Sequence, residues 1–213
     1  MNRAREHVFR DSMLRNNPAW AQLLGLCPLL AVSNSLVNAL GLSLASAFVL
    51  VGANLSVSAL RKSIPDFLRL PIFMLIIATL TTCAVLLLEA FAFGLYQRIA
   101  LFVQIIVTNC MILGRVEAFA SRARPGAALR DALGTACGFA IALVILGALR
   151  EALATGRVGA RLDDLFGPAV GSAGVPLWPE SLTIPLAALP PGAFICAALL
   201  LALARASARA TDR

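Results

Sequence analysis

Long apolar runs, separated by short polar or charged segments, dominate the hydrophobic pattern of this chain. A helix needs roughly 20 mostly apolar residues to cross the hydrocarbon core of a bilayer. Six stretches approach that length: about Trp20–Leu40, Leu42–Leu60, Leu70–Leu88, Ile99–Leu113, Leu129–Leu149 and Thr183–Ala204. The pattern therefore predicts an all-α integral membrane protein with six transmembrane helices.

The first and fourth of these spans contain residues that do not suit a plain lipid-facing helix. Pro28 and then Ser33–Ser35 interrupt the first span, while Asn109 lies inside the fourth, which runs into the charged Arg115. A proline inside a helix removes a backbone donor and clashes with the preceding turn. Polar groups at membrane depth are costly unless they face protein or a cavity. Both spans are therefore predicted to be broken into half-helices.

These two spans open the two halves of the chain, and three crossings separate them. The halves, about 19–90 and 95–205, would therefore run through the membrane in opposite directions. Broken helices at corresponding positions are typical of an inverted repeat. The sequence predicts a 3+3 inverted repeat preceded by a polar segment, 1–18. An outer loop is expected at 151–182, and a terminal tail at 206–213.

Composition supports the membrane assignment. Hydrophobic residues make up 60% of the 213 positions and charged residues only 14%, and the mean hydropathy is +0.86. A water-soluble globular domain carries about 25% charged residues, so that class is excluded. The net charge of +7 could still indicate nucleic acid or an anionic surface as a partner.

The positions of the basic residues decide this question. Fourteen of the eighteen lie on one side of the predicted membrane, and four lie on the other side. The fourteen are Arg3, Arg5, Arg10, Arg15, Arg61, Lys62, Arg69, Arg115, Arg122, Arg124, Arg130, Arg205, Arg209 and Arg213. An excess of Lys and Arg marks cytoplasmic loops, so both termini are expected to be cytoplasmic. The charge is read as an orientation and lipid-contact signal, with no nucleic-acid site.

Two cysteines, Cys27 and Cys110, lie in the two spans that are predicted to be broken. They follow the starts of those spans by seven and eleven residues. At a rise of ~1.5 Å per residue, both fall in the middle third of a ~30 Å core. A membrane cysteine is often only a small apolar residue. That interpretation is preferred for Cys83, Cys137 and Cys196, which lie in smooth apolar runs.

Paired thiols at this depth could form a disulfide or bind a soft metal or an iron–sulfur cluster. A 2Fe–2S cluster takes four ligands, usually cysteines. The lone histidine, His7, lies in the N-terminal segment, so two further ligands would have to come from another chain.

Three segments resemble a known family of membrane proteins. They are LGLCPLLAVS at 24–33, VTNCMILGRVEAFA at 107–120 and LPPGAF at 189–194. They are similar to the E-type subunit of the Rnf (or Rsx) electron-transport complex and to the D-type subunit of the sodium-pumping NADH:quinone oxidoreductase. The resemblance covers about residues 10–205, and the outer loop is its least characteristic part.

The resemblance implies membership of a bacterial inner-membrane machine. Such a complex passes electrons between ferredoxin and NAD and couples them to Na⁺ or H⁺ translocation. Its homologous A-type and E-type subunits share one 2Fe–2S cluster, and neighbouring subunits carry flavins. By this resemblance Cys27 and Cys110 would be two of the cluster ligands, and the A-type subunit would supply the other two. The isolated chain is expected to have no catalytic residues and no activity of its own.

Three acidic residues are candidates for an ion path: Glu89, Asp131 and Glu117. They could equally be ordinary interfacial charges. Two further functions remain open, namely an inverted-repeat secondary transporter and a purely structural assembly subunit. The transporter would tolerate loss of Cys27, and the assembly subunit would hold no iron.

Overall fold

The computed structural model describes residues 22–91, 93–158, 175–176 and 189–211. The predicted N-terminal segment, 1–18, and most of the predicted outer loop lie outside the described residues. The described elements are α2 Leu26–Val32, α3 Leu36–Leu60, η2 Asp66–Leu68, α4 Arg69–Phe91, α5 Phe93–Val103, η3 Gln104–Thr108, α6 Cys110–Arg115, the π-helical turn η4 Val116–Ala120, α7 Pro125–Thr155, β1 Arg157–Val158, β2 Val175–Pro176 and α9 Pro190–Thr211. The two short strands pair antiparallel beyond the end of α7.

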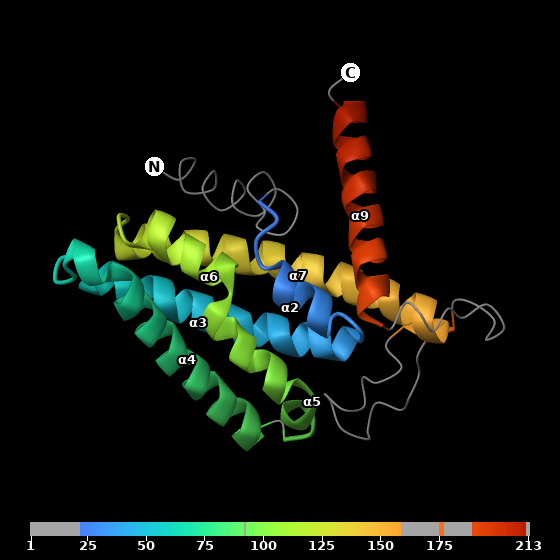
Figure 1. Cartoon of the computed structure of the whole chain (residues 1–213), viewed down its shortest axis with the longest axis horizontal. Coiled ribbons are helices and arrows are strands. Elements are labelled where there is room, and N and C mark those ends of the chain that lie inside the picture. The colour runs from blue at the N-terminus through green and yellow to red at the C-terminus, as the bar shows by residue number, and fades with distance from the viewer. Residues whose placement is uncertain (1–21, 92, 159–174, 177–188, 212–213) are drawn as a thin grey trace.

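The two longest helices, α3 and α7, lie side by side at the centre of the molecule (Figure 1). They run antiparallel, because the start of α3 is bonded to the end of α7 by the Leu36 N–H and Glu151 Oε2, 2.8 Å apart. At the other end, Ser58 Oγ of α3 donates to the carbonyl of Ala123, just before α7, at 2.6 Å. Gly147 makes this close pairing feasible, because a Cβ there would lie only 3.0 Å from Ala39 Cβ. Small residues at helix interfaces are typical of membrane proteins.

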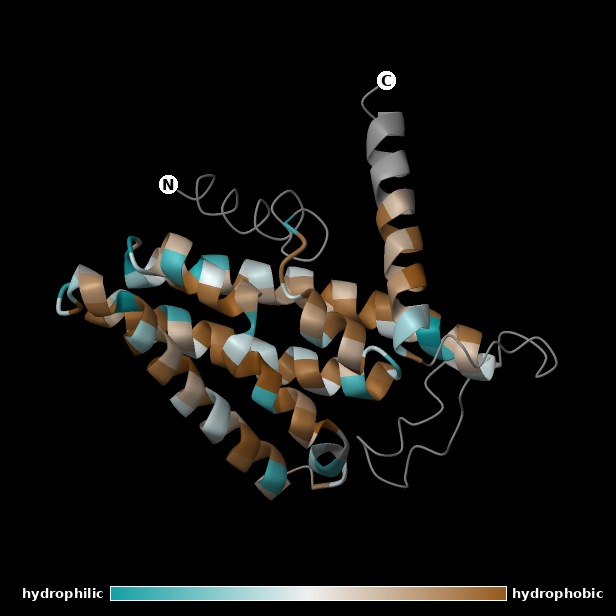
Figure 2. Ribbon diagram, in the orientation of Figure 1, coloured by the Kyte–Doolittle hydropathy of each residue, from teal (hydrophilic) through white to brown (hydrophobic). Residues whose placement is uncertain are grey.

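Apolar side chains cover much of the outside of the bundle as well as its core. Leu101 is 82% exposed and Phe91 87% exposed. Figure 2 shows apolar residues along the helices, with hydrophilic residues gathered mainly near turns and helix ends. Within the described part of the chain, four helical segments are long and apolar enough to cross a membrane by length and composition: 36–60, 69–91, 99–120 and 125–155. The predicted class, an all-α multi-pass membrane protein, is confirmed, while the count of six spans stays a prediction.

The predicted boundary between the first two spans is wrong. The chain is continuously helical over α3, so no interruption occurs at Leu40–Leu42. The break lies earlier, at Ser33–Ser35, where Ser35 is extended (φ −146°, ψ 144°). Pro28 also does not break its helix. It occupies the first turn of α2, where a missing N–H costs no intrahelical bond.

Other boundaries shift for local reasons. Helix α7 extends past the predicted 129–149 to Thr155 and ends where Gly156 adopts a left-handed conformation (φ 71°), so the outer loop begins later than residue 151. A glycine after the last helical residue is a common helix stop. The last helix begins at Pro190 and runs to Thr211, so most of the predicted tail, 206–213, is helical. Helix α9 leaves the bundle near the end of α7 (Figure 1).

The same order of elements occurs in each half. Nonhelical residues precede a short helix (α2 or α6), a turn follows, and then comes a long helix (α3 or α7) and one more helix (α4 or α9). The end of each long helix also contacts the turn before the other long helix. This arrangement agrees with the predicted inverted repeat.

Candidate functional site

The nonhelical residues before α2 meet the break before α6. The backbone N–H of Gly25 donates to Sγ of Cys110, with 3.1 Å between the two atoms. Cys27 follows Gly25 by two residues, so its backbone lies within about 7 Å of Gly25. The two cysteines chosen from the sequence are thus brought to the same region by segments 85 positions apart.

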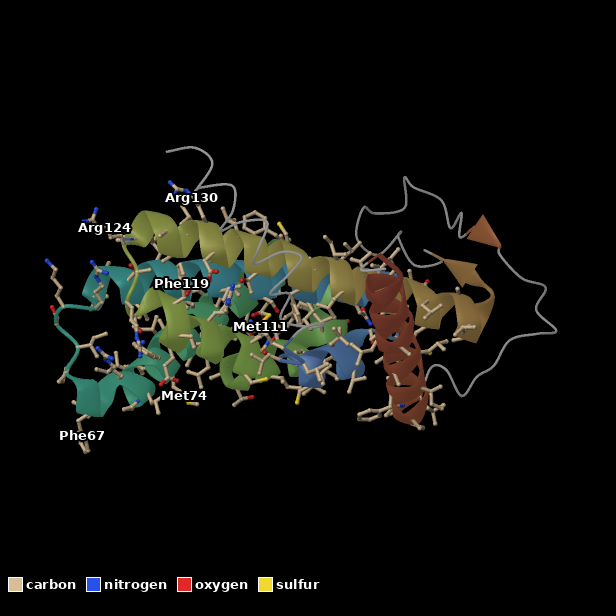
Figure 3. All side chains as sticks on the ribbon, turned by 90° about the horizontal axis from the view of Figure 1, so that it is seen from above. Phe67, Met74, Met111, Phe119, Arg124 and Arg130 are labelled. Carbon is tan, nitrogen blue, oxygen red and sulfur yellow. The ribbon has the colours of Figure 1, made fainter. Side chains whose placement is uncertain are left out.

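Gly25 makes this close approach feasible. Its backbone is left-handed (φ 77°, ψ 21°), a conformation that favours glycine. A Cβ at this position would lie 3.0 Å from Phe139 Cε2, 3.3 Å from Met111 Cβ and 3.4 Å from Asn109 Oδ1. A side chain at this position would therefore require its neighbours to shift. Figure 3 shows Met111 midway along the molecule, with Arg124 and Arg130 toward one end.

Asn109 forms the break in the fourth span. Its backbone is extended (φ −66°, ψ 112°), and it separates the 3-10 segment η3 from α6. Its Oδ1 accepts from the N–H of Met111 at 3.0 Å, which caps the new helix. The side chain is buried, and its Nδ2 has no hydrogen-bond partner among the described residues. The prediction of a broken fourth span therefore has a specific structural cause.

Both cysteines are exposed although their neighbours are buried. Cys27 is followed by the buried Pro28, and Cys110 lies between the buried Asn109 and Met111. Cys83 and Cys137 are also exposed, on α4 and α7, and Cys196 is buried. The described residues contain no group of three or more His, Cys, Asp or Glu side chains that could hold a metal ion. Two outward-facing thiols, one accepting an amide N–H, fit half of an iron–sulfur ligand set.

The three candidate ion-path residues occupy different environments. Glu89 is exposed near the end of α4, and Glu117 is exposed on η4. Asp131 is buried in α7, and its Oδ1 accepts from Arg115 Nη2 at 2.6 Å. Arg115 also donates from Nε to Thr135 Oγ1 at 3.1 Å. Asp131 thus fixes α6 to α7, a link that the sequence did not predict.

The sequence predicts two charged residues at the other end of α7 on the outer side of the membrane. Arg150 is one of the four basic residues expected there, and Glu151 is the first residue of the predicted outer loop. The structure buries both, Arg150 at 2% exposure and Glu151 at 3%. Arg150 contacts Leu30 and Ser33, and Glu151 contacts Leu36, on either side of the first break. The sequence feature that could have indicated this burial is an adjacent pair of opposite charges directly after a long apolar run.

Comparisons with known proteins identify the family of the chain. Residues 6–201 match the family model described as "Rnf-Nqr subunit, membrane protein". A protein of Pseudomonas paraeruginosa, named as the E subunit of an ion-translocating oxidoreductase complex, is 50% identical over 92% of this chain and 82% of its own length. Proteins of the same name from Shewanella baltica and Vibrio vulnificus are 49% and 45% identical, over 91% and 92% of this chain and 83% and 85% of their own lengths. The chain therefore belongs to the Rnf-Nqr family of membrane-protein subunits.

Proposed function

We propose that this chain is the E-type membrane subunit of an ion-translocating oxidoreductase complex and that it holds half of an intramembrane 2Fe–2S cluster. The names of relatives at 45–50% identity support the first statement. The expected location is the bacterial inner membrane, with both termini cytoplasmic, as the basic residues indicate. The electron carriers would be ferredoxin and NAD, and the translocated ion Na⁺ or H⁺.

The bond between Gly25 N–H and Cys110 Sγ is the observation that carries the cluster proposal. It joins the residue that precedes α2 to the first residue of α6, and each of these half-helices carries an exposed cysteine. A cysteine that only fills space in the membrane would not require a left-handed glycine packed against Asn109 and Met111 of the fourth span. Amide donors to sulfur also influence the potential of such clusters.

The missing ligands would come from another protein of the complex. Cys27 and Cys110 are exposed within the chain, so a partner can approach both thiols. We assign this role to the homologous A-type subunit, with flavin-bearing subunits as further neighbours. When bound, the cluster would relay single electrons between carriers on the two membrane faces. The residues of this chain supply two thiolates, one N–H donor and the rigid backbone around them.

Ion translocation would involve acidic groups of the same chain. The exposed Glu89 and Glu117 are the accessible candidates, and the buried Asp131 is a third. Because Asp131 is already bonded to Arg115, an ion-handling role for it would require that ion pair to open.

The test is iron content and the EPR signal of the whole complex, purified without oxygen. We expect Cys27→Ser and Cys110→Ser to lose the signal of one 2Fe–2S cluster while the complex remains assembled. Cys137→Ser is the matched control, because Cys137 is also an exposed cysteine but lies on an unbroken helix. A wild-type signal in both serine variants would exclude these cysteines as ligands.

The inverted arrangement around two broken helices also supports an alternative, a secondary transporter with its substrate site at the breaks. A transporter would keep full transport activity after Cys27→Ala and would contain no iron. The cluster-binding chain would lose electron transfer after the same substitution. Iron content therefore separates the two functions.

A further inference from the structure

Two neighbouring residues of α7 hold the helix ends on both sides of the first break. Arg150 and Glu151 are 2% and 3% exposed, which is rare for charged side chains. Burying charge is costly unless the charge is bonded, so their partners explain their position. Four of the bonds that hold them go to backbone or hydroxyl groups of segments far away in the sequence.

Arg150 binds the end of the half-helix α2. Its Nη1 donates to the carbonyl of Leu30 at 3.1 Å and to Ser33 Oγ at 2.9 Å. The last carbonyls of a helix have no partner within the helix, and they carry partial negative charge. The guanidinium group of Arg150 supplies both a hydrogen-bond donor and a positive charge at this end of α2.

Glu151 binds the start of the next helix. Its Oε2 accepts from the N–H of Leu36, the first residue of α3, at 2.8 Å. Ser35 occupies the N-cap position but forms no capping bond with its side chain. The carboxylate therefore replaces the usual cap, and its charge suits the positive end of a helix dipole. Each residue of the pair thus meets the helix end of opposite charge.

Arg150 also connects a third helix. Its Nη2 donates to the carbonyl of Leu189, which precedes the first residue of α9, at 3.3 Å. A helix as short as α2, with seven residues, cannot be stable by itself. Its position must therefore come from such contacts with α3, α7 and α9.

We propose that Arg150 and Glu151 are positioning residues for Cys27. This inference rests on the proposed function, because it assumes that Cys27 is a cluster ligand. Cys27 lies three residues before Leu30, less than one helical turn from the carbonyl that Arg150 binds. A shift of that end of α2 would move the Cys27 thiol almost directly. The pair would then influence the cluster without touching it.

The experiment compares whole complexes carrying Arg150→Gln, Arg150→Lys or Glu151→Gln. The first readout is hydrogen–deuterium exchange of the α2 and Leu36 amides, which does not depend on iron. The second is the EPR line shape and midpoint potential of the cluster. Arg61→Gln is the matched control. Arg61 Nη1 donates to the carbonyl of Arg122 at 2.8 Å, but this bond is exposed and lies twelve residues from Cys110.

We expect Arg150→Gln to accelerate exchange in α2 by roughly tenfold or more, because a charged hydrogen bond is lost. The EPR line shape and midpoint potential should change in the same complex. Arg150→Lys keeps the charge but not the fork of donors, so its effects should be smaller. Glu151→Gln keeps an acceptor oxygen and should mainly accelerate exchange at Leu36. Arg61→Gln should leave all of these signals unchanged.

Each failure has a separate meaning. Unchanged exchange and an unchanged EPR signal in Arg150→Gln would overturn the proposal. Faster exchange with an unchanged midpoint potential would make the pair a structural support only, and this also overturns it. If Arg150→Gln prevents assembly, Arg150→Lys and Glu151→Gln decide by the same criteria. A wild-type complex without iron would instead refute the proposed function, while the exchange data would still report on the helix contacts.

Discussion

Single residues determine how the two broken spans meet. Gly25 adopts a conformation that other residues rarely adopt, and a Cβ there would crowd its neighbours. Asn109 ends one helix segment and caps the next with its side chain. Arg115 and Asp131 fix α6 to α7, which holds the segment that carries Cys110. Each of these contacts can be removed by one substitution.

Gly25→Ala should destabilise the complex and weaken the cluster site together. A left-handed conformation costs a non-glycine residue about 1–2 kcal/mol, and overpacking adds about 1–3 kcal/mol. Thermal unfolding and iron content of the purified complex measure both effects. Gly126→Ala is the control, since nothing lies within 4 Å of a Cβ there. Equal melting temperatures and equal iron for the two variants would contradict the packing described at Gly25.

Asp131→Ala should reduce the free energy of unfolding by about 3–5 kcal/mol, because it leaves the guanidinium of Arg115 without its carboxylate. Adding Arg115→Met should recover much of this loss. A double-mutant cycle, measured by denaturation in detergent, gives the coupling energy between the two residues. The exposed Glu117→Gln serves as the control and should change stability by less than about 0.5 kcal/mol. If Asp131→Asn retained full stability but lost ion transport, Asp131 would belong to the ion path.

At the scale of elements, residue types predicted that the first and fourth spans are broken, but the predicted boundary between the first two spans was wrong. Polar residues at Ser33–Ser35 and Asn109 signalled the breaks, because such groups are costly in lipid. The end of the first break depends on Glu151, which caps Leu36 from 115 positions away. A hydrogen-bond partner that is far away in the sequence does not change the local hydrophobic pattern. The pattern therefore predicts the wrong start for α3. The same limit applied to Arg150 and Glu151, whose burial depends on α2 and α9.

The close packing of α3 against α7 predicts that larger side chains are not tolerated where the two helices touch. Gly147→Ala should destabilise the bundle by about 1–3 kcal/mol, since the new Cβ would lie 3.0 Å from Ala39 Cβ. Ala39→Gly in the same chain removes the clash and should restore part of the stability. Thermal unfolding of the two single variants and the double variant measures this compensation. No rescue by Ala39→Gly would show that the two helices do not meet at these positions.

At the scale of the whole molecule, hydropathy was sufficient for the fold class, and charge gave an expected orientation. The antiparallel α3–α7 pair agrees with an inverted repeat, because the second helix of each half points in the opposite direction. The sequence could not show that Cys27 and Cys110 lie near the same point. That depends on how α2 and α6 pack, and the sequence alone gives no partner for Gly25.

This arrangement predicts opposite membrane sides for the two ends of α7. Ser63→Cys, in the turn after α3, should react with a membrane-impermeant maleimide only from the cytoplasmic side. Thr155→Cys, at the last residue of α7, should react only from the other side. Both native residues are exposed, and 31 helical residues span about 46 Å, enough to cross the bilayer. Labelling of both positions from the same side would refute the predicted topology.

The central claim is that the start of α2 and the break before α6 meet to present Cys27 and Cys110 to one shared cluster. High-resolution cryo-EM of the complete complex, prepared without oxygen, tests this claim most directly. The account predicts continuous density joining the Sγ atoms of Cys27 and Cys110 to one iron–sulfur group at an interface between two proteins of the complex. The Gly25 amide should lie against Cys110 Sγ, as it does at 3.1 Å here. Cysteine side chains that face lipid, or that are separated by other side chains with no density between them, would contradict it.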